Sequence, residues 1–235
     1  MSGLIDKAGG AKGVSEGGFD IQSSQSRILQ AHQAWEESML RQLDELKASV
    51  TALQPQALAY RCGGIFQDGQ LVLTYWGRQV AIGWPDLQAR FLTGEACPVF
   101  DTTLLLFYLR SADGEPLGDR WISFRELPGG AFYHQAYQGY SGDQMARYFV
   151  DRQAAFHEAA RALDGVHLQS LAEFAYAFLP LPRIRLAAIL WPGDEEFPTR
   201  GQVLFDAAAS HYMTTDGLAI LGAGLARRLE RVVKP

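Results

Sequence analysis

The sequence predicts an α+β fold in which antiparallel strands pack against several helices. Two segments, near residues 57–84 and 173–191, are rich in aromatic and β-branched residues interrupted by turn signals. Other segments carry apolar residues at helical spacing, and the two kinds of segment do not alternate regularly as in a Rossmann domain or a barrel. With 48% hydrophobic and 20% charged residues, the 235-residue chain can bury a sizeable core.

The N-terminal part divides into a tail and a helix. Residues 1–25 are rich in glycine and serine and lack apolar periodicity, so we expect a flexible tail followed by a single α+β domain over 26–235. From Ser26, apolar residues recur at helical spacing up to Val50, which predicts a long amphipathic helix ending before Pro55. Core packing is the favoured role of its apolar stripe, with partner binding as the alternative.

A three-stranded antiparallel meander is predicted next, over residues 57–66, 71–76 and 78–84. Gln67-Asp68-Gly69 supplies the first turn, and Gly77 marks the second. Asp86 is then expected to cap a short helix that starts near Leu87.

The segment Asp101–Leu109 suits either a helix or a buried strand. We favour a helix because Asp101 can cap it and Ala112-Asp113-Gly114 can terminate it. Residues 121–127 alternate between apolar and polar types, which predicts a short strand before the turn at Pro128-Gly129-Gly130.

Two further helices are predicted in the middle of the chain, over Phe132–Gln138 and Asp143–Arg161. Ser141 and Gln144 match a capping box for the second of these helices.

The C-terminal part is predicted to contain a hairpin and a helix. Residues 173–179 and 184–191 are apolar stretches separated by Pro180-Leu181-Pro182, which is typical of two strands joined by a turn. Residues 217–233 carry leucines on one helical face, and Thr215 or Asp216 is expected to cap this helix.

Charge and hydropathy exclude several partners. A net charge of -5 argues against nucleic acid, because affinity for a phosphate backbone comes mainly from clustered Lys and Arg. The N-terminal residues lack the apolar region of a secretory signal, and no run approaches the roughly 18 apolar residues of a membrane span. We therefore expect a cytoplasmic protein that binds neither nucleic acid nor membrane.

Residue usage also limits the cofactors. Cys62 and Cys97 lie far apart in the sequence, so we do not expect a cysteine-bound iron-sulfur cluster or a structural zinc site. We expect two partly buried thiols instead. No lysine occurs between residues 48 and 233, which excludes Schiff-base chemistry and a P-loop from the body of the chain. No GxGxxG spacing follows a predicted strand. The sequence thus assigns no cofactor.

Three consecutive carboxylates, Asp194, Glu195 and Glu196, occupy a turn next to Trp191. They can bind a divalent cation, act as a general acid and base, or accept hydrogen bonds from a ligand; the alternative is a solvated turn in which one carboxylate caps the backbone. We expect Trp191, Phe197 and Phe205 to wall this turn and to raise a carboxylate pKa by desolvation.

Asp206 and His211 follow this turn, and their spacing is wrong for the i, i+4 metal pair of a helix. We expect Asp206 to cap a helix whose first turn is Ala207–Ala209, and we expect no metal site.

A second cluster combines an arginine with aromatic residues and a histidine. Arginine and aromatics can hold an anionic or planar ligand through paired hydrogen bonds and stacking, and a histidine can move a proton near neutral pH. The alternative is an Arg125–Glu126 ion pair beside a tyrosine-rich helix that packs on the core. The candidate binding residues of this cluster are Trp121, Arg125, Glu126, Tyr133 and His134, with Tyr137 and Tyr140 nearby.

Three motifs together resemble an uncharacterised domain family of anaerobic bacteria and archaea, over about Tyr60–Leu229. They are Trp121-x-Ser123-Phe124-Arg125-Glu126-Leu127-Pro128-Gly129-Gly130, Leu179-Pro180-x-Pro182, and Trp191-x-Gly193-Asp194-Glu195-Glu196-Phe197-Pro198 with Leu204-Phe205-Asp206. The resemblance implies no established activity. Some relatives are joined to a four-cysteine iron-sulfur module or are associated with corrinoid-dependent one-carbon metabolism, but this chain lacks those cysteines.

The sequence favours a ligand-binding or accessory protein for a tetrapyrrole-like or other planar anionic molecule, with Arg125 and residues 194–196 lining one cleft. One alternative is a carboxylate-dependent or metal-assisted hydrolase or lyase that uses residues 194–196 with Asp206 or His211. Another is a scaffold that presents its first and last helices to a protein partner.

Overall fold

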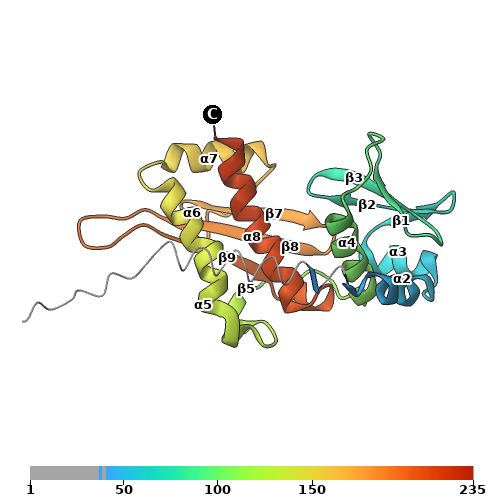
Figure 1. Cartoon of the computed structure of the whole chain (residues 1–235). Coiled ribbons are helices and arrows are strands. Elements are labelled where there is room, and N and C mark those ends of the chain that lie inside the picture. The colour runs from blue at the N-terminus through green and yellow to red at the C-terminus, as the bar shows by residue number, and fades with distance from the viewer. Residues whose placement is uncertain (1–36, 39–40, 235) are drawn as a thin grey trace, which may run out of the picture.

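The computed structural model describes residues 37, 38 and 41–234, which form two antiparallel sheets with helices around them. The four-stranded sheet has the order β1-β2-β3-β4, and the five-stranded sheet has the order β5-β9-β8-β7-β6. Figure 1 shows the two sheets side by side, with α4 between them and α5 to α8 over the larger sheet. The predicted α+β class with antiparallel strands is therefore confirmed.

The smaller sheet extends the predicted meander by one strand. Its strands are β1 (Ile65–Gln67), β2 (Gln70–Tyr75), β3 (Arg78–Gly83) and β4 (Ala89–Phe91). The helix predicted near Leu87 is wrong, because Leu87 has a positive φ of 55° and donates its N–H to Gly83 O at 2.9 Å. This tight turn sends the chain back along β3, where it forms β4.

The segment predicted as the first strand, 57–66, is mostly helical. Helix α3 spans Pro55–Cys62, with proline in its first turn, where the missing N–H costs nothing. Leu58, Ala59 and Cys62 form its buried stripe, and Gly63 ends it with a φ of 72°. The aromatic and apolar residues of this segment thus follow a helical period, and only Ile65–Gln67 is a strand.

Two other helices, α2 and α4, respectively precede α3 and follow β4 in the chain. Helix α2 covers Leu43–Thr51 and buries Leu46 and Val50; the rest of the predicted N-terminal helix and the predicted tail fall almost wholly outside the described residues. Helix α4 covers Val99–Ser111, which confirms the helix predicted at Asp101–Leu109.

The larger sheet contains the predicted C-terminal hairpin, as β7 (Ala175–Leu181) and β8 (Ile184–Trp191). Its other strands are β5 (Trp121–Ser123), β6 (Val166–His167) and β9 (Arg200–Asp206). The predicted strand 121–127 is shorter than expected, because the chain turns into the 3-10 helix η1 (Phe124–Glu126). The link between β8 and β9 projects beyond the sheet as a long loop (Figure 1).

Four helices cover one face of this sheet (Figure 1). They are α5 (Gly130–Tyr140), α6 (Gly142–Phe149), α7 (Gln153–Ala162) and α8 (Thr215–Val232), and the short 3-10 helix η2 (Ala209–His211) precedes α8. The helices predicted at Phe132–Gln138 and 217–233 are confirmed as α5 and α8. Neither Thr215 nor Asp216 caps α8; the Thr215 hydroxyl donates to Pro128 O at 2.7 Å.

The single helix predicted over Asp143–Arg161 is wrong, since the chain breaks between α6 and α7. Asp151 has a positive φ of 55°, which ends the helical path. The break allows Phe149 of α6 and Phe156 of α7 to meet edge to face, with ring centroids 5.3 Å apart. The predicted capping box is absent as well, because the Ser141 hydroxyl donates to Tyr137 O at 2.6 Å.

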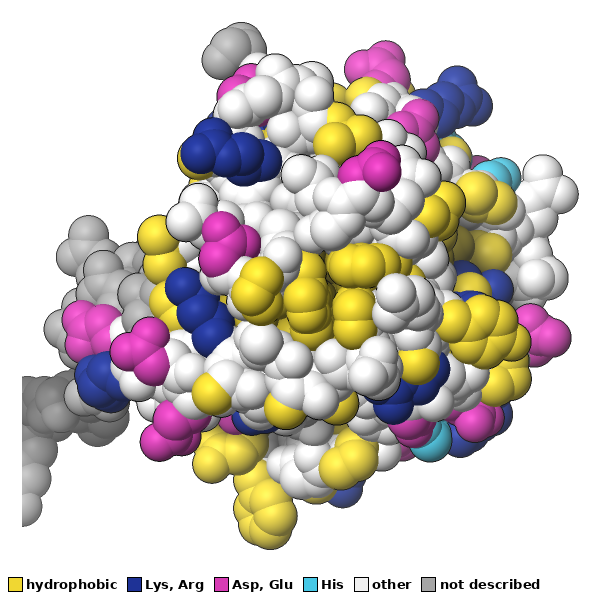
Figure 2. Space-filling model, turned by 90° about the vertical axis from the view of Figure 1, so that its right-hand side faces the viewer, with side chains coloured by type: hydrophobic (Ala, Val, Ile, Leu, Met, Phe, Trp, Pro, Cys, Tyr) yellow, Lys and Arg dark blue, Asp and Glu magenta, His cyan; other side chains and the backbone are white. Residues whose placement is uncertain are grey.

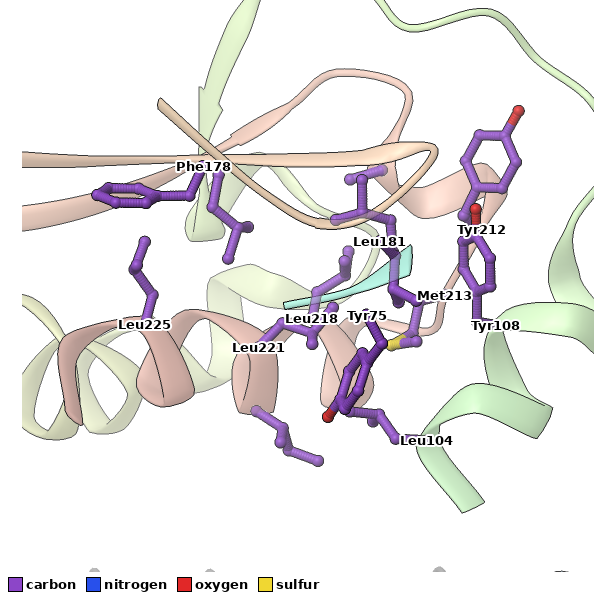
Figure 3. Packing of buried hydrophobic residues seen from close by; sticks show 14 of the residues in the cluster. Tyr75, Leu104, Tyr108, Phe178, Leu181, Tyr212, Met213, Leu218, Leu221 and Leu225 are labelled. Carbon is purple, nitrogen blue, oxygen red and sulfur yellow. The ribbon is translucent and has the colours of Figure 1, made fainter. Parts of the chain in front are cut away.

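The two sheets share one hydrophobic core, to which both contribute buried side chains. Leu218 and Leu221 of α8 lie close to Leu181 of β7, and Tyr75 of β2 and Leu104 of α4 close the same cluster (Figure 3).

Hydrogen bonds reinforce this contact between the sheets. The Trp76 N–H, just after β2, donates to Pro180 O of β7 at 2.9 Å. The buried Tyr108 hydroxyl of α4 donates to Cys62 O at 2.6 Å and accepts the Arg183 N–H at 3.1 Å. One hydroxyl therefore links α4, the end of α3 and the β7–β8 turn.

The surface at the end of the molecule that carries the smaller sheet has both hydrophobic and charged side chains. Figure 2 shows hydrophobic side chains across the middle of this face, with charged side chains around them. None of the helices in the described part of the chain has the length and apolar character that crossing a membrane requires.

Replacing Tyr108 with phenylalanine should lower the free energy of unfolding by about 1–3 kcal/mol, because two buried backbone groups lose their shared partner. Urea unfolding followed by circular dichroism measures this loss. Tyr60→Phe is the matched control, since Tyr60 is 80% exposed, and it should leave the midpoint unchanged. Equal stability of Tyr108→Phe and the parent would show that the bridge contributes nothing.

Candidate functional site

Two adjoining cavities form a groove between helix α5 and strand β9. The larger, of about 380 Å³, is lined by Gln138, Asp143, Trp191, Arg200, Gly201 and Gln202. The smaller, of about 180 Å³, is lined by Gln138, Gln202, Val203 and Tyr137 together with Ser123–Arg125 and His134. Because Gln138 and Gln202 belong to both cavities, we treat them as one site and call it the α5–β9 groove.

The groove exists because β5 is too short to cover β9. Strand β5 pairs only with residues 204–206 of β9, so on that edge no strand lies beside residues 200–203, which pair with β8 on their other edge. The junction of α5 and α6 occupies that edge, where Gln138 Nε2 donates to Gly201 O and to Asp143 Oδ1, both at 2.8 Å. A Cβ atom on Gly142 or Gly201 would collide with the facing backbone, so this approach requires two glycines.

Arg125 is held at one end of the groove by the 3-10 helix η1. Glu126 Oε2 accepts the Ser123 N–H at 2.7 Å and the Ser123 hydroxyl at 2.8 Å, which fixes the turn that carries Arg125. These two hydrogen bonds lower the pKa of Glu126. Glu126 pairs with Arg120 at 3.8 Å and not with Arg125, so Arg125 is exposed with no ion pair among the described residues.

His134 and Tyr137 lie on the α5 wall. His134 Nδ1 lies 2.9 Å from Ala131 O, which leaves Nε2 with no partner among the described residues. Tyr137 is buried below it, with its ring stacked on Phe124 at a centroid distance of 4.1 Å. His134 therefore presents one nitrogen above an aromatic floor.

Trp191 and Arg200 form the other end of the groove. They are register partners at the last rung of the β8–β9 ladder, just before the projecting loop. The Trp191 side chain is partly exposed, and Arg200 is exposed with no ion pair to a described carboxylate. An aromatic surface and a cation thus stand next to each other at this end.

The acidic turn lies outside the groove. Asp194 Oδ1 accepts the N–H groups of Glu196 at 2.9 Å and of Phe197 at 2.7 Å, and these bonds lower the Asp194 pKa. Glu195 and Glu196 are exposed. The expected rise in carboxylate pKa is wrong for Asp194, because Phe205 is buried in the core and Phe197 is 62% exposed.

Asp206 is buried, with 1% of its surface exposed, and it does not cap an α-helix. Its Oδ1 accepts the N–H groups of Gly118 at 2.8 Å and Ala208 at 2.9 Å. Its Oδ2 accepts Arg185 Nη2 at 2.5 Å and Nε at 3.0 Å, and the Arg185 guanidinium lies 5.3 Å from the Trp121 ring centroid. This ion pair fastens the segment before β5 onto the sheet.

The remaining candidates are separated from the groove. His211 pairs with Asp113, with 2.6 Å between Nδ1 and Oδ2, and not with Asp206. Tyr133 lines a different cavity of about 360 Å³ with Met213 and Asp216. In the described part of the chain, no three His, Cys, Asp or Glu side chains gather closely enough to hold a metal ion.

The model of a domain of unknown function, DUF3786, matches residues 54–228. The chain belongs to the DUF3786 family. No curated protein and no solved structure is similar enough to be counted as a relative. The DUF3786 match spans all three motifs and every residue of the α5–β9 groove.

Sequence reasoning missed four residues that organise this DUF3786 chain. Arg200, Gln138 and Gln202 line the groove, and Arg185 neutralises Asp206. Arg185 is a charged residue inside the apolar run of β8, and this was a signal of a buried counter-charge, because an inward-facing charge needs a partner of opposite sign. Nothing in the sequence marked the two glutamines.

Replacing Asp206 with asparagine should cost about 3 kcal/mol of folding free energy, near the lower end for a broken buried pair because Arg185 is partly exposed. The double variant Arg185→Met/Asp206→Asn should lose less, since no unpaired charge remains and the asparagine amide oxygen can still accept the N–H groups of Gly118 and Ala208. Asp194→Asn is the control in an exposed turn and should shift the urea midpoint only slightly. A single variant as stable as the double one would contradict this account.

The Glu126 carboxylate should make folding stability depend on pH. Its folded pKa lies below the ordinary value of 4.5, so the stability it contributes is present above that value and is lost as the pH falls through the folded pKa. Glu126→Gln should therefore be less stable than the parent near pH 7, and the difference should shrink in acid. Urea unfolding at a series of pH values tests this, with Glu195→Gln as the control; a pH-independent difference would contradict it.

Proposed function

We propose that this DUF3786 protein is a ligand-binding protein whose α5–β9 groove holds a planar, anionic small molecule. The observation that carries the proposal is the placement of two cations without ion-pair partners, Arg125 and Arg200, in two cavities that share walls. In a protein with net charge -5, such a site offers local positive charge to an anion.

The size of the groove supports a small molecule. The larger cavity, of about 380 Å³, lies in the range of ligand pockets, roughly 300–1,000 Å³, and the adjoining cavity of about 180 Å³ extends it. The Gly142–Gly201 contact holds α6 against β9, and the Gln138 hydrogen bond to Gly201 O holds α5 there, so the groove is preformed. A preformed site loses little conformational entropy on binding.

The chemistry of the walls supports a planar ligand with acidic groups. Trp191 offers a flat apolar surface for stacking, and Arg200 beside it can donate paired hydrogen bonds to a carboxylate. Arg125 can bind an acidic group at the far end, and Gln202 and His134 Nε2 can form neutral hydrogen bonds between them. Tetrapyrroles with carboxylate side chains have this combination of features.

Unlike Arg125, the acidic turn does not contact the ligand in this proposal. Asp194 is engaged with its own turn, so we assign residues 194–196 to the shape of the projecting loop next to Trp191 and not to ligand contact. A metal-assisted hydrolase that uses these carboxylates with His211 has no support from the geometry, because His211 is bonded to Asp113. The last helix buries most of its apolar residues, which leaves little of that face for docking.

Titration with haem and with cobamides, followed by absorption spectroscopy, tests the proposal. We expect a saturable spectral change with at least one of them. Arg125→Gln and Arg200→Gln should each weaken binding by roughly 10- to 100-fold, the value of a charged hydrogen bond. Trp191→Leu should also weaken it.

Arg90→Gln is the matched control, because Arg90 is exposed on β4, outside the groove. It should bind as the parent does. The absence of a spectral or thermal response to every probe would overturn the proposal, and so would full binding by Arg125→Gln and Arg200→Gln.

A further inference from the structure

We propose that Arg61 and Arg183 form a second binding site, for a doubly charged oxyanion such as a phosphate group, at the joint between the two sheets. The site is distinct from the α5–β9 groove and shares no residue with it. It lies where the end of α3 meets the β7–β8 turn, around Gly63.

Both arginines have a buried nitrogen that lacks an acceptor. The Nε atoms of Arg61 and Arg183 are inaccessible to solvent and form no hydrogen bond in the described part of the chain. Each side chain as a whole is only partly buried, so an ion from solvent can reach the guanidinium. A charged donor buried without a partner is costly, which indicates that a partner is missing.

Both arginines lie close to Gly63. Arg183 Nε is 3.3 Å from the position that a Cβ atom of Gly63 would take, and Arg61 is two residues before Gly63. The Cγ atom of Arg61 lies 3.3 Å from the corresponding position on Gly114, whose φ is 98°. Both side chains thus pack closely over glycines with positive φ, where a Cβ atom would crowd them.

Both arginines also affect the pKa of the buried Cys62 thiol. Burial raises the pKa of Cys62 to about 11, while the positive charges of Arg61 and Arg183 both act to lower it. Both charges are therefore close enough to act on one buried atom.

The acidic side chains of this region are engaged elsewhere. Asp206 is bonded to Arg185, which also lies 3.7 Å from Asp119, and Asp113 is bonded to His211. Neither Arg61 nor Arg183 forms an ion pair with a described carboxylate. Glu115 is the remaining candidate, since its backbone carbonyl accepts the Tyr212 hydroxyl nearby.

Two unpaired guanidinium groups match an anion that carries two charges. The planar fork of arginine suits oxygens of phosphate and carboxylate groups alike, and a phosphate presents both charges on one compact centre. A bound oxyanion would connect α3 to the β7–β8 turn, alongside the bridge formed by Tyr108. The ligand should therefore stabilise the whole fold.

Thermal unfolding of the full chain tests this site with inorganic phosphate as the probe, compared with chloride at equal ionic strength. Phosphate should raise the melting temperature in a saturable way, and calorimetry should give a 1:1 stoichiometry. Arg61→Gln and Arg183→Gln should each weaken phosphate binding at least tenfold. Equal melting in phosphate and chloride would overturn the proposal.

A double variant covers the case in which a single variant folds poorly. Arg61→Leu/Arg183→Leu removes both unpaired charges, so without phosphate it should melt at or above the parent temperature and should show no response to phosphate. A double variant that still responds to phosphate would overturn the proposal.

Controls separate this site from the groove and from another ligand class. Arg125→Gln and Arg200→Gln should keep the full phosphate response; loss of the response in them would overturn the proposal by placing phosphate in the groove. Glu115→Gln should bind phosphate as tightly as the parent or more tightly. A response to succinate with none to phosphate would overturn the assignment of the ligand.

Discussion

The hydroxyl of Tyr108 helps to fix the relative position of the two sheets. It contacts the end of α3 through Cys62 O and the β7–β8 turn through the Arg183 N–H, and its ring lies next to that of Tyr212, with centroids 5.9 Å apart. Hydrophobic burial is not directional, so it can hold the two sheets together without fixing their relative position. A buried hydroxyl with one donor and one acceptor fixes that position, because both bonds need correct geometry.

The candidate sites follow from this arrangement and from strand length. A strand edge that no neighbour covers presents unpaired backbone groups, and β5 pairs with only three residues of β9. The groove occupies the place of the missing pairs, and the side chain of Gln138 satisfies Gly201 O there. The Asp206–Arg185 ion pair in turn holds β5 beside the last part of β9. The position of Arg125 therefore depends on a buried carboxylate at the end of a neighbouring strand.

Local sequence pattern predicted the elements in which the apolar period and the turn residues indicate the same structure, such as the β7–β8 hairpin and α8. It failed at residues 57–66, where an aromatic-rich composition suggested a strand although Leu58, Ala59 and Cys62 follow a helical period. It also joined α6 to α7, because an aspartate with positive φ leaves no signal in the apolar pattern.

Local sequence pattern likewise predicted only part of the candidate site. Arg125 and Trp191 were visible as an arginine and an aromatic in unusual surroundings, and both line the groove. The role of Asp206 depended on Arg185, whose position opposite it follows from the pairing of β8 with β9 and not from any local motif. Gln138 and Gln202 line the groove only because the α5–α6 junction crosses β9 at that level.

The contact between Gly142 and Gly201 has a consequence for motion. Because two backbones touch there without side chains between them, α5 and α6 cannot tilt toward β9, and a ligand cannot draw this wall inward. Any closure over a bound molecule must come from the opposite side, through the loop beyond Trp191 or the turn that carries Arg125. The site would then have one fixed wall, formed by α5, α6 and β9. Its selectivity would depend on the loop beyond Trp191 and on the turn that carries Arg125.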